Sequence, residues 1–293
     1  MKYSTKTPPM VCMMTNSSCY KGTSTMQIQG ILWHSTGANN PTLKRYVQPD
    51  DNAPNKDELI AKIGKNKYGN DYNHSKKSAG LNAWIGKLED GTVAAVQVMP
   101  WNYRPWGCAS GKNGSCNNGW IQFEICEDNL KDEAYFNAVY KEACELTAYL
   151  CKVYNIAPEG FHYINGVRVP TILCHQDSYV LGMGSNHSDI YHWFKKYGKD
   201  MDTVRKDVAA LIGKEIKEDT YMVEMRTLQR GHRGEDVKSL QILLNGKGFK
   251  CGTADGIFGA NTEKAVKAFQ KSVGAVQDGY AGKITMTALI NGK

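Results

Sequence analysis

The chain contains an apolar run that changes abruptly into small, polar and turn-forming residues: Ile31-Leu32-Trp33-His34-Ser35-Thr36-Gly37-Ala38-Asn39-Asn40-Pro41. The apolar part is long enough for a buried strand, and its histidine stands where the strand gives way to a loop. A side chain at that point is held rigidly and faces a loop-lined cleft, which suits a metal ligand as well as it suits a hydrogen-bonded structural histidine. A second apolar run that ends in a histidine favours the interpretation as a metal ligand: Val169-Pro170-Thr171-Ile172-Leu173-Cys174-His175-Gln176-Asp177.

Length and composition limit the classes of protein to consider. With 293 residues, 41% of them hydrophobic, the chain is long enough for one large domain or two. The formal net charge of +7 comes from scattered Lys and Arg residues, which gives little support to nucleic-acid binding but suits an anionic polymer. No apolar run approaches the roughly 18 residues of a membrane span, and residues 1–19 are interrupted too often for a signal peptide. We therefore expect synthesis in the cytoplasm and no membrane insertion.

The nine cysteines are an odd number, which argues against a complete disulfide framework. Four of them fall in stretches that read as strand or helix core and are expected to be small buried residues in a reducing compartment: Cys126, Cys144, Cys151 and Cys174. Cys108 could pair with Cys116, and Cys12 with Cys19, under oxidising conditions. The spacing leaves both pairings open.

Strands alternating with amphipathic helices up to about Gly213 predict an α/β domain. After an extended lead-in we expect, in chain order, a strand at 27–34, a helix between 54 and 64, a hairpin at 83–88 and 92–99, a strand at 120–126, a helix at 132–154, the second histidine strand and a last amphipathic helix. The charged stretch that follows predicts a linker. The expected domains are therefore 1–213 and 225–293, joined by 214–224.

The C-terminal region contains an internal repeat of the form D-G-x-x-G-x-x-T. One copy starts at Asp255 and the other at Asp278. Each copy reads as a turn that starts a helix, because Asp-Gly supplies the turn and Asn or Thr can cap the first amides. Apolar faces around these turns predict a small all-α module of about three helices.

A loop rich in glycine and serine, at 182–193, follows the second histidine strand and offers candidates for a third metal ligand, among them His187 and Asp189. Catalytic zinc takes three protein ligands and leaves a fourth position for water, whose pKa falls to about 7. His34, His175 and one residue of this loop meet that count. A hydrolase also needs a base. Glu124 fits this role, because a glutamate inside an apolar strand is rarely buried without a partner.

The residues around these candidates resemble the zinc-dependent N-acetylmuramoyl-L-alanine amidase family of the peptidoglycan-recognition-like fold. The resemblance covers about residues 25–213 and is carried by Trp33 to Pro41, Gln122-Phe123-Glu124, His175, and His187-Ser188-Asp189 with Trp193. It implies a mixed central sheet flanked by helices and hydrolysis of the bond between N-acetylmuramic acid and L-alanine. It assigns His34, His175 and Asp189 as zinc ligands, Glu124 as the catalytic glutamate, and Trp106 and Asn39 as substrate contacts.

Two departures from the family pattern affect this assignment. The family has a catalytic Lys two residues before its third ligand, whereas this chain has His187. Either a protonated His187 takes over the role of the Lys, as a second catalytic residue, or His187 is itself the ligand in place of Asp189. The family also often has a Trp-His pair before the catalytic strand, whereas here Trp106 is followed by Gly107.

The C-terminal module resembles the three-helix peptidoglycan-binding domain of many wall hydrolases, from about Leu228 to Leu289. Together the two resemblances imply an endolysin or autolysin that is released to bacterial peptidoglycan by a holin or by lysis. Two alternatives remain: a recognition protein of the same fold that only binds, and a zinc peptidase that cuts within the stem peptide. The peptidase pattern has an Asp several residues after the first His, and Asp50 is too far from His34 for that.

Overall fold

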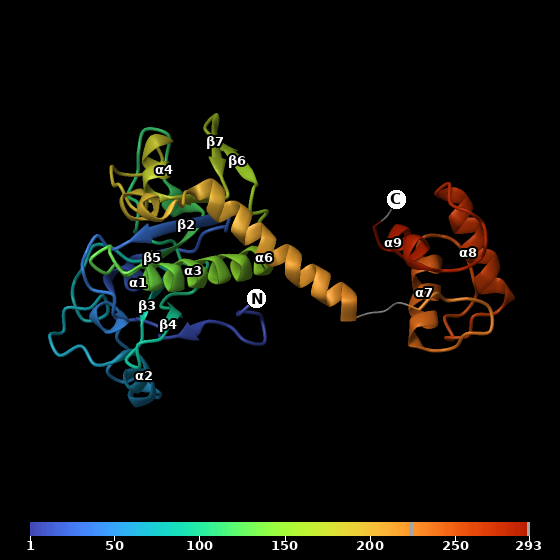
Figure 1. Cartoon of the computed structure of the whole chain (residues 1–293), viewed down its shortest axis with the longest axis horizontal. Coiled ribbons are helices and arrows are strands. Elements are labelled where there is room, and N and C mark those ends of the chain that lie inside the picture. Colours follow the sequence, from blue (N-terminus) through green and yellow to red (C-terminus); the bar gives the residue numbers. More distant parts are fainter. Residues whose placement is uncertain (223–225, 292–293) are drawn as a thin grey trace. The chain divides into compact units, whose positions relative to one another are not determined.

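The computed structural model describes residues 1–222 and 226–291, which form two compact units, Met1–Ile216 and Lys217–Lys293 (Figure 1). The first unit combines a sheet with helices, and the described part of the second is built from helices. The predicted fold class, an α/β sheet domain followed by a small all-α region, is confirmed. The exact boundaries 1–213 and 225–293 stay predictions, and residues 223–225 and 292–293 lie outside the described part.

A six-stranded mixed sheet forms the centre of the first unit. In spatial order its strands are β1 (Met10–Val11), β4 (Val93–Gln97), β3 (Ala83–Lys87), β5 (Trp120–Ile125), β2 (Gly30–Ser35) and β8 (Ile172–Cys174). β3 and β4 pair antiparallel, as expected for the hairpin, and the remaining neighbours pair in parallel. β2 therefore has a strand on either side, and all six of its residues are buried.

Side chains along β2 alternate between the two faces of the sheet. Ile31 and Trp33 pack in the apolar cluster that also holds the buried side of helix α3 (Glu133–Val153) and the start of α6 (Met201–Met222). His34 therefore points to the opposite face. β5 runs parallel to β2 with His34 directly across from Glu124, so this glutamate lies on the same face as His34.

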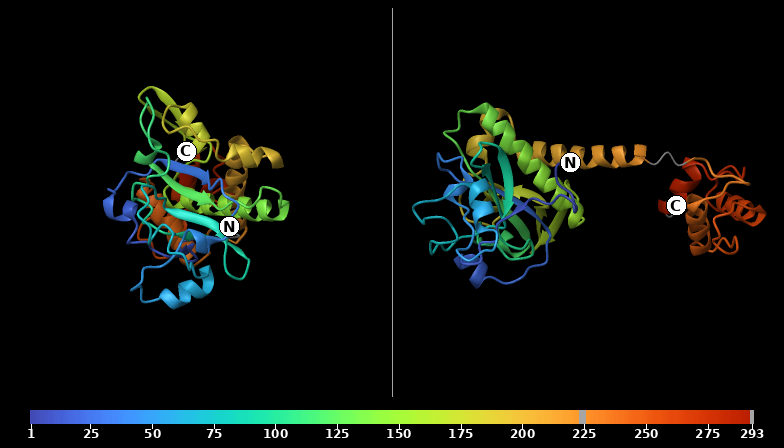
Figure 2. Two further views of the ribbon diagram at one scale, coloured as in Figure 1. Left: turned by 90° about the vertical axis from the view of Figure 1, so that its left-hand side faces the viewer. Right: turned by 90° about the horizontal axis from the view of Figure 1, so that it is seen from below.

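The helices cover both faces of the sheet (Figures 1 and 2). α3 begins at Glu133, one residue after its expected start, because Asp132 caps it: the Asp132 carboxylate accepts a hydrogen bond of 3.0 Å from the Tyr135 backbone N–H. The other helices of this unit are α1 (Ser18–Gly22), α2 (Lys56–Ile63), α4 (His175–Val180) and α5 (Tyr191–Phe194), with 3₁₀ turns at Leu43–Arg45, Cys116–Asn118 and Lys195–Tyr197. α2 packs with Trp84 and Val96 on the face opposite α3.

The last helix continues through 214–222, part of the expected linker, because this stretch is rich in helix formers such as Lys and Glu. One expectation about local structure is wrong. The second histidine strand is not continuous. Its first residues belong to a separate hairpin of β6 (Phe161–Ile164) and β7 (Val167–Pro170), and the strand that leads into His175 is β8.

All nine cysteines are buried and unpaired. This confirms Cys126, Cys144, Cys151 and Cys174 as core residues, each at most 3% exposed. Neither of the two disulfide pairings left open by the spacing is formed.

The second unit consists of α7 (Glu235–Gly246), α8 (Ala260–Ser272) and α9 (Lys283–Asn291) around their own apolar core. A buried glutamine from the preceding helix holds each D-G-x-x-G-x-x-T turn. Gln270 accepts a hydrogen bond of 3.0 Å from Gly279 N–H and donates to Asp278, to the Tyr280 carbonyl and to Thr285. Gln241 makes the same set of bonds to the first copy. The two copies of the sequence repeat are thus held by the same set of hydrogen bonds, each to the side-chain amide of a buried glutamine.

We expect Gln270→Leu to destabilise the second unit by about 2–4 kcal/mol, because leucine fits the space but leaves several buried polar groups without a partner. Hydrogen exchange of the full-length protein, read in the peptides of this unit, measures the effect. Gln229→Leu is the matched control, since Gln229 is exposed. Equal exchange in the two variants would contradict the role assigned to Gln270.

Candidate metal centre and active site

Three side chains from separate segments converge at the carboxyl ends of β2 and β8, beside α4. Nδ1 of His34 lies 3.1 Å from Nδ1 of His175 and 3.1 Å from Oδ2 of Asp189. Nδ1 of His175 lies 3.3 Å from Oδ1 of Asp189. The three residues are between 2% and 8% exposed. We call this group the His–His–Asp cluster; it contains the three residues to which the resemblance assigns the metal.

The donor atoms of the His–His–Asp cluster fit a zinc ion. Burial raises the pKa of the Asp189 carboxyl, but hydrogen bonds from His175 and His34 outweigh it and hold that pKa well below its ordinary value. Asp189 is therefore a carboxylate at neutral pH. Two imidazole nitrogens that face each other at 3.1 Å need a proton or a cation between them. Two imidazoles and one carboxylate are a ligand set typical of catalytic zinc.

Glu124 lies on the same face of the sheet as His34, in the adjacent strand. Burial is the main cause that raises the pKa of its carboxyl to about 8; Asp189 and Glu127 add to this and His34 opposes it. Within the described residues no hydrogen-bond donor contacts the carboxylate. A carboxyl group with a strongly raised pKa near a metal-ligand group is typical of a catalytic acid or base.

His187 lies beside the His–His–Asp cluster but is not one of its three donors. Its ring stacks on that of His175, with 4.4 Å between the centroids, and is exposed on the outer side. The hydroxyl of Ser185 lies 3.1 Å from Nδ1 of His187 and 3.1 Å from Nε2 of His175. The structure thus brings Asp189, rather than His187, into the group of ligand atoms.

The two expected substrate contacts lie outside the cluster. Asn39 is exposed in the loop that follows β2. Trp106 is half-buried and packs against the apolar cluster on the α2 face. Their roles toward a substrate stay predictions.

Sequence reasoning missed an ion pair next to the site, between Glu127 and His192. Nε2 of His192 lies 2.9 Å from Oε1 of Glu127, a carboxylate that is only 2% exposed. The same oxygen accepts a hydrogen bond of 2.9 Å from Gly37 N–H in the loop after β2. The pair therefore ties α5 to the loop that follows His34. The sequence did contain one indication of this pair, since Glu127 is an acidic residue that directly follows a buried strand and Cys126.

This pair predicts a pH-dependent contribution to stability. The hydrogen bond to Glu127 raises the pKa of His192 above its ordinary value, despite an opposing effect of burial. A histidine whose pKa is higher in the folded than in the unfolded chain stabilises the folded state. This contribution is complete at a pH below the pKa of the unfolded chain, and it is lost as the pH rises through the pKa of the folded chain. His192→Gln should cost about 1 kcal/mol near pH 6 and less near pH 9.

Thermal unfolding across this pH range measures the difference between wild type and His192→Gln. His162→Gln is the control, because His162 contacts the carbonyl oxygen of Gln29 instead of a carboxylate. A cost for His192→Gln that does not change with pH would contradict the ionic character of the pair.

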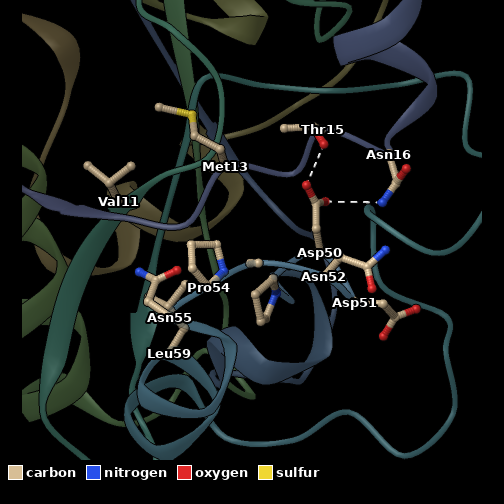
Figure 3. Close-up of a pocket in the computed structure, with 12 residues that line it drawn as sticks. Val11, Met13, Thr15, Asn16, Asp50, Asp51, Asn52, Pro54, Asn55 and Leu59 are labelled. Carbon is tan, nitrogen blue, oxygen red and sulfur yellow. Dashed lines mark hydrogen bonds between the residues drawn. The ribbon is translucent and has the colours of Figure 1, made fainter.

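A pocket of about 540 Å³ lies between residues 11–16 and 49–59, and none of its lining residues belongs to the His–His–Asp cluster (Figure 3). Asp50 lies in its wall. Its carboxylate accepts hydrogen bonds from Thr15, Asn16 and Asn73, so it holds the N-terminal segment in place. This structural role agrees with the exclusion of Asp50 as a ligand of a peptidase-type site.

Two known families match parts of the chain. Residues 24–191 match the N-acetylmuramoyl-L-alanine amidase family, and residues 233–289 match the peptidoglycan binding domain. The first match covers more than half of the chain, so the chain belongs to the N-acetylmuramoyl-L-alanine amidase family.

Several known proteins are similar to parts of the chain. The N-acetylmuramoyl-L-alanine amidase CwlL of Bacillus licheniformis is 31% identical over 185 residues, which are 60% of this chain and 46% of that protein. A spore cortex-lytic enzyme of Bacillus cereus is 43% identical over 65 residues, 22% of this chain and 25% of that protein. The solved structure of the Staphylococcus aureus hydrolase AmiA is 17% identical, covers 70% of this chain and 78% of its own, and has a TM-score of 0.41. The chain thus spans between a quarter and about half the length of these curated relatives.

Proposed function

We propose that the first unit hydrolyses the amide bond between N-acetylmuramic acid and L-alanine in bacterial peptidoglycan, with a zinc ion held by His34, His175 and Asp189. The observation that carries this proposal is the convergence of these three side chains on the sheet face that also holds Glu124. Membership of the amidase family supports the choice of bond.

Each residue of the site has a role in this proposal. A zinc ion, when bound, would lower the pKa of a water molecule to about 7 and polarise the amide carbonyl. Glu124 accepts the proton of the attacking water and passes it to the leaving nitrogen. Its pKa of about 8 suits proton donation, and a nearby cation lowers that pKa enough for proton acceptance. His187 donates a hydrogen bond to the oxygen that gains charge in the transition state, and Trp106 and Asn39 contact the substrate.

The second unit has a separate role in the proposal. It matches the peptidoglycan binding domain, and we assign to it the binding of the intact wall. Attachment raises the local concentration of the first unit at its substrate without taking part in the chemistry. No helix among the described residues is long and apolar enough to cross a membrane.

Digestion of purified peptidoglycan by the full-length protein tests the proposal. Mass analysis should show whole stem peptides with a free N-terminal alanine and a glycan strand without peptides. A chelator should abolish the release, and added zinc should restore it.

The products also distinguish the other functions open to this chain. Cleavage inside the stem peptide would indicate a peptidase, and binding to the wall without any product would indicate a recognition protein. Full amidase activity in excess chelator, after loss of zinc has been verified, would contradict the metal-dependent mechanism.

A further inference from the structure

A buried side-chain amide, that of Asn117 in the 3₁₀ turn before β5, has an orientation dictated by the backbone. Its Oδ1 lies 3.1 Å from the backbone N–H of Cys108 and 3.3 Å from that of Gly107. Backbone N–H groups can only donate, so the oxygen and not the nitrogen of this amide must face them. Nδ2 accordingly faces the carbonyl oxygen of Ala109, at 3.3 Å.

The orientation of Asn117 determines that of Gln122, a fully buried residue of β5. The Asn117 oxygen accepts a further hydrogen bond of 2.9 Å, which must come from Nε2 of Gln122. The other end of the Gln122 amide, Oε1, then points away from Asn117. It lies 2.8 Å from Nε2 of His34.

The orientation of Gln122 in turn determines which ring nitrogen of His34 carries a proton. An amide oxygen can only accept, so Nε2 of His34 must donate. In the neutral ring, Nδ1 is then left with its lone pair free. Nδ1 is the atom that faces His175 and Asp189.

We propose that Gln122 is a positioning residue that holds His34 in the Nε2–H tautomer and so presents Nδ1 to the metal, with Asn117 setting the direction of the Gln122 amide. This inference rests on the metal site of the proposed function. A hydrogen bond to the second nitrogen of a ligand histidine fixes both its tautomer and its ring orientation, and loss of such a bond typically weakens metal binding about 10–100-fold.

Gly107, which follows Trp106 where the family often has a histidine, provides the space for this arrangement. A Cβ atom at Gly107 would lie 2.1 Å from Oε1 of Gln122 and 3.1 Å from Nε2 of His34. Any side chain at this position would displace the Gln122 amide from His34. The departure from the family pattern at position 107 is thus matched by the glutamine at position 122.

The zinc dissociation constant of the full-length protein, measured by competition with a chromophoric chelator, is the first readout. Gln122→Leu should weaken zinc binding about 10–100-fold. Gln48→Leu is the matched control, because Gln48 is also buried and its amide donates to Val47 and Gly64 carbonyls without contact to the cluster. Both variants lose a buried amide, but only Gln122→Leu loses the hydrogen bond to His34. Only Gln122→Leu should therefore change the zinc affinity.

The second readout is the tautomer of His34 in the zinc-bound protein, obtained from nitrogen-15 NMR of its ring. Wild type should show the Nε2–H form, and Gln122→Leu should show a mixture of both forms. Gly107→Ala keeps the glutamine but displaces it, so it should reproduce both effects if Gln122→Leu does not fold.

The outcomes separate this inference from the proposed function. Folded Gln122→Leu protein with wild-type zinc affinity, or with an unchanged His34 tautomer, would overturn the inference. Wild-type protein that binds no zinc would instead contradict the proposed metal site.

Discussion

Glu124→Gln is expected to retain zinc while its rate of amide hydrolysis falls by about 10²–10⁴-fold, the usual loss when a general base is removed. Glutamine has nearly the same shape as glutamate but cannot accept the proton of the attacking water. The carboxylate is not among the three ligand groups of the His–His–Asp cluster, so its replacement should leave the metal in place. Metal analysis and turnover of soluble muropeptides, measured on the same preparation, test both halves of the prediction.

Glu89→Gln is a suitable control for this experiment. Glu89 is an exposed carboxylate that pairs with Lys44 at 3.0 Å, far in the sequence from any residue of the site. Its replacement should change neither zinc content nor rate. If Glu124→Gln loses its zinc together with its activity, Glu124 is a ligand and its assignment as base is wrong.

The positions of the candidate site residues that lie on or directly after strands could be predicted from the sequence. An apolar run ending in a histidine indicates a buried strand whose last residues reach the edge of the sheet, and His34 and His175 both occupy that position. The period of two along a strand then explains why Glu124 shares the face of His34 once β5 pairs beside β2. Which strands become neighbours, and in which register they pair, depends on tertiary packing. The period of two within one strand does not predict either.

The choice between Asp189 and His187 could not be made in this way. Both lie in a loop, where no periodicity relates a residue to a face or a neighbour. The positioning role proposed for Gln122 had no signal in the sequence for a different reason, because a glutamine inside a strand looks like an ordinary polar residue until its partners are known. The β6–β7 hairpin did have a signal: Asn165-Gly166 joins its strands with positive φ at both residues, as a type I′ turn requires.

Asp189→Ala should remove zinc from the protein and bring hydrolysis to background, because it deletes one of the three proposed ligands, whose donor atoms lie within 4.8 Å of one another. His187→Ala should keep the metal and lower kcat by about 10²–10³-fold, the usual cost of losing one oxyanion donor. His187→Lys, which restores a cationic donor at the position where the family has Lys, should retain measurable activity. Zinc content and kcat of the three variants distinguish the two assignments. A metal-free His187→Ala beside a zinc-containing Asp189→Ala would instead make the site three histidines, and the stacking of His187 on His175 would then be the geometry of a ligand without its metal.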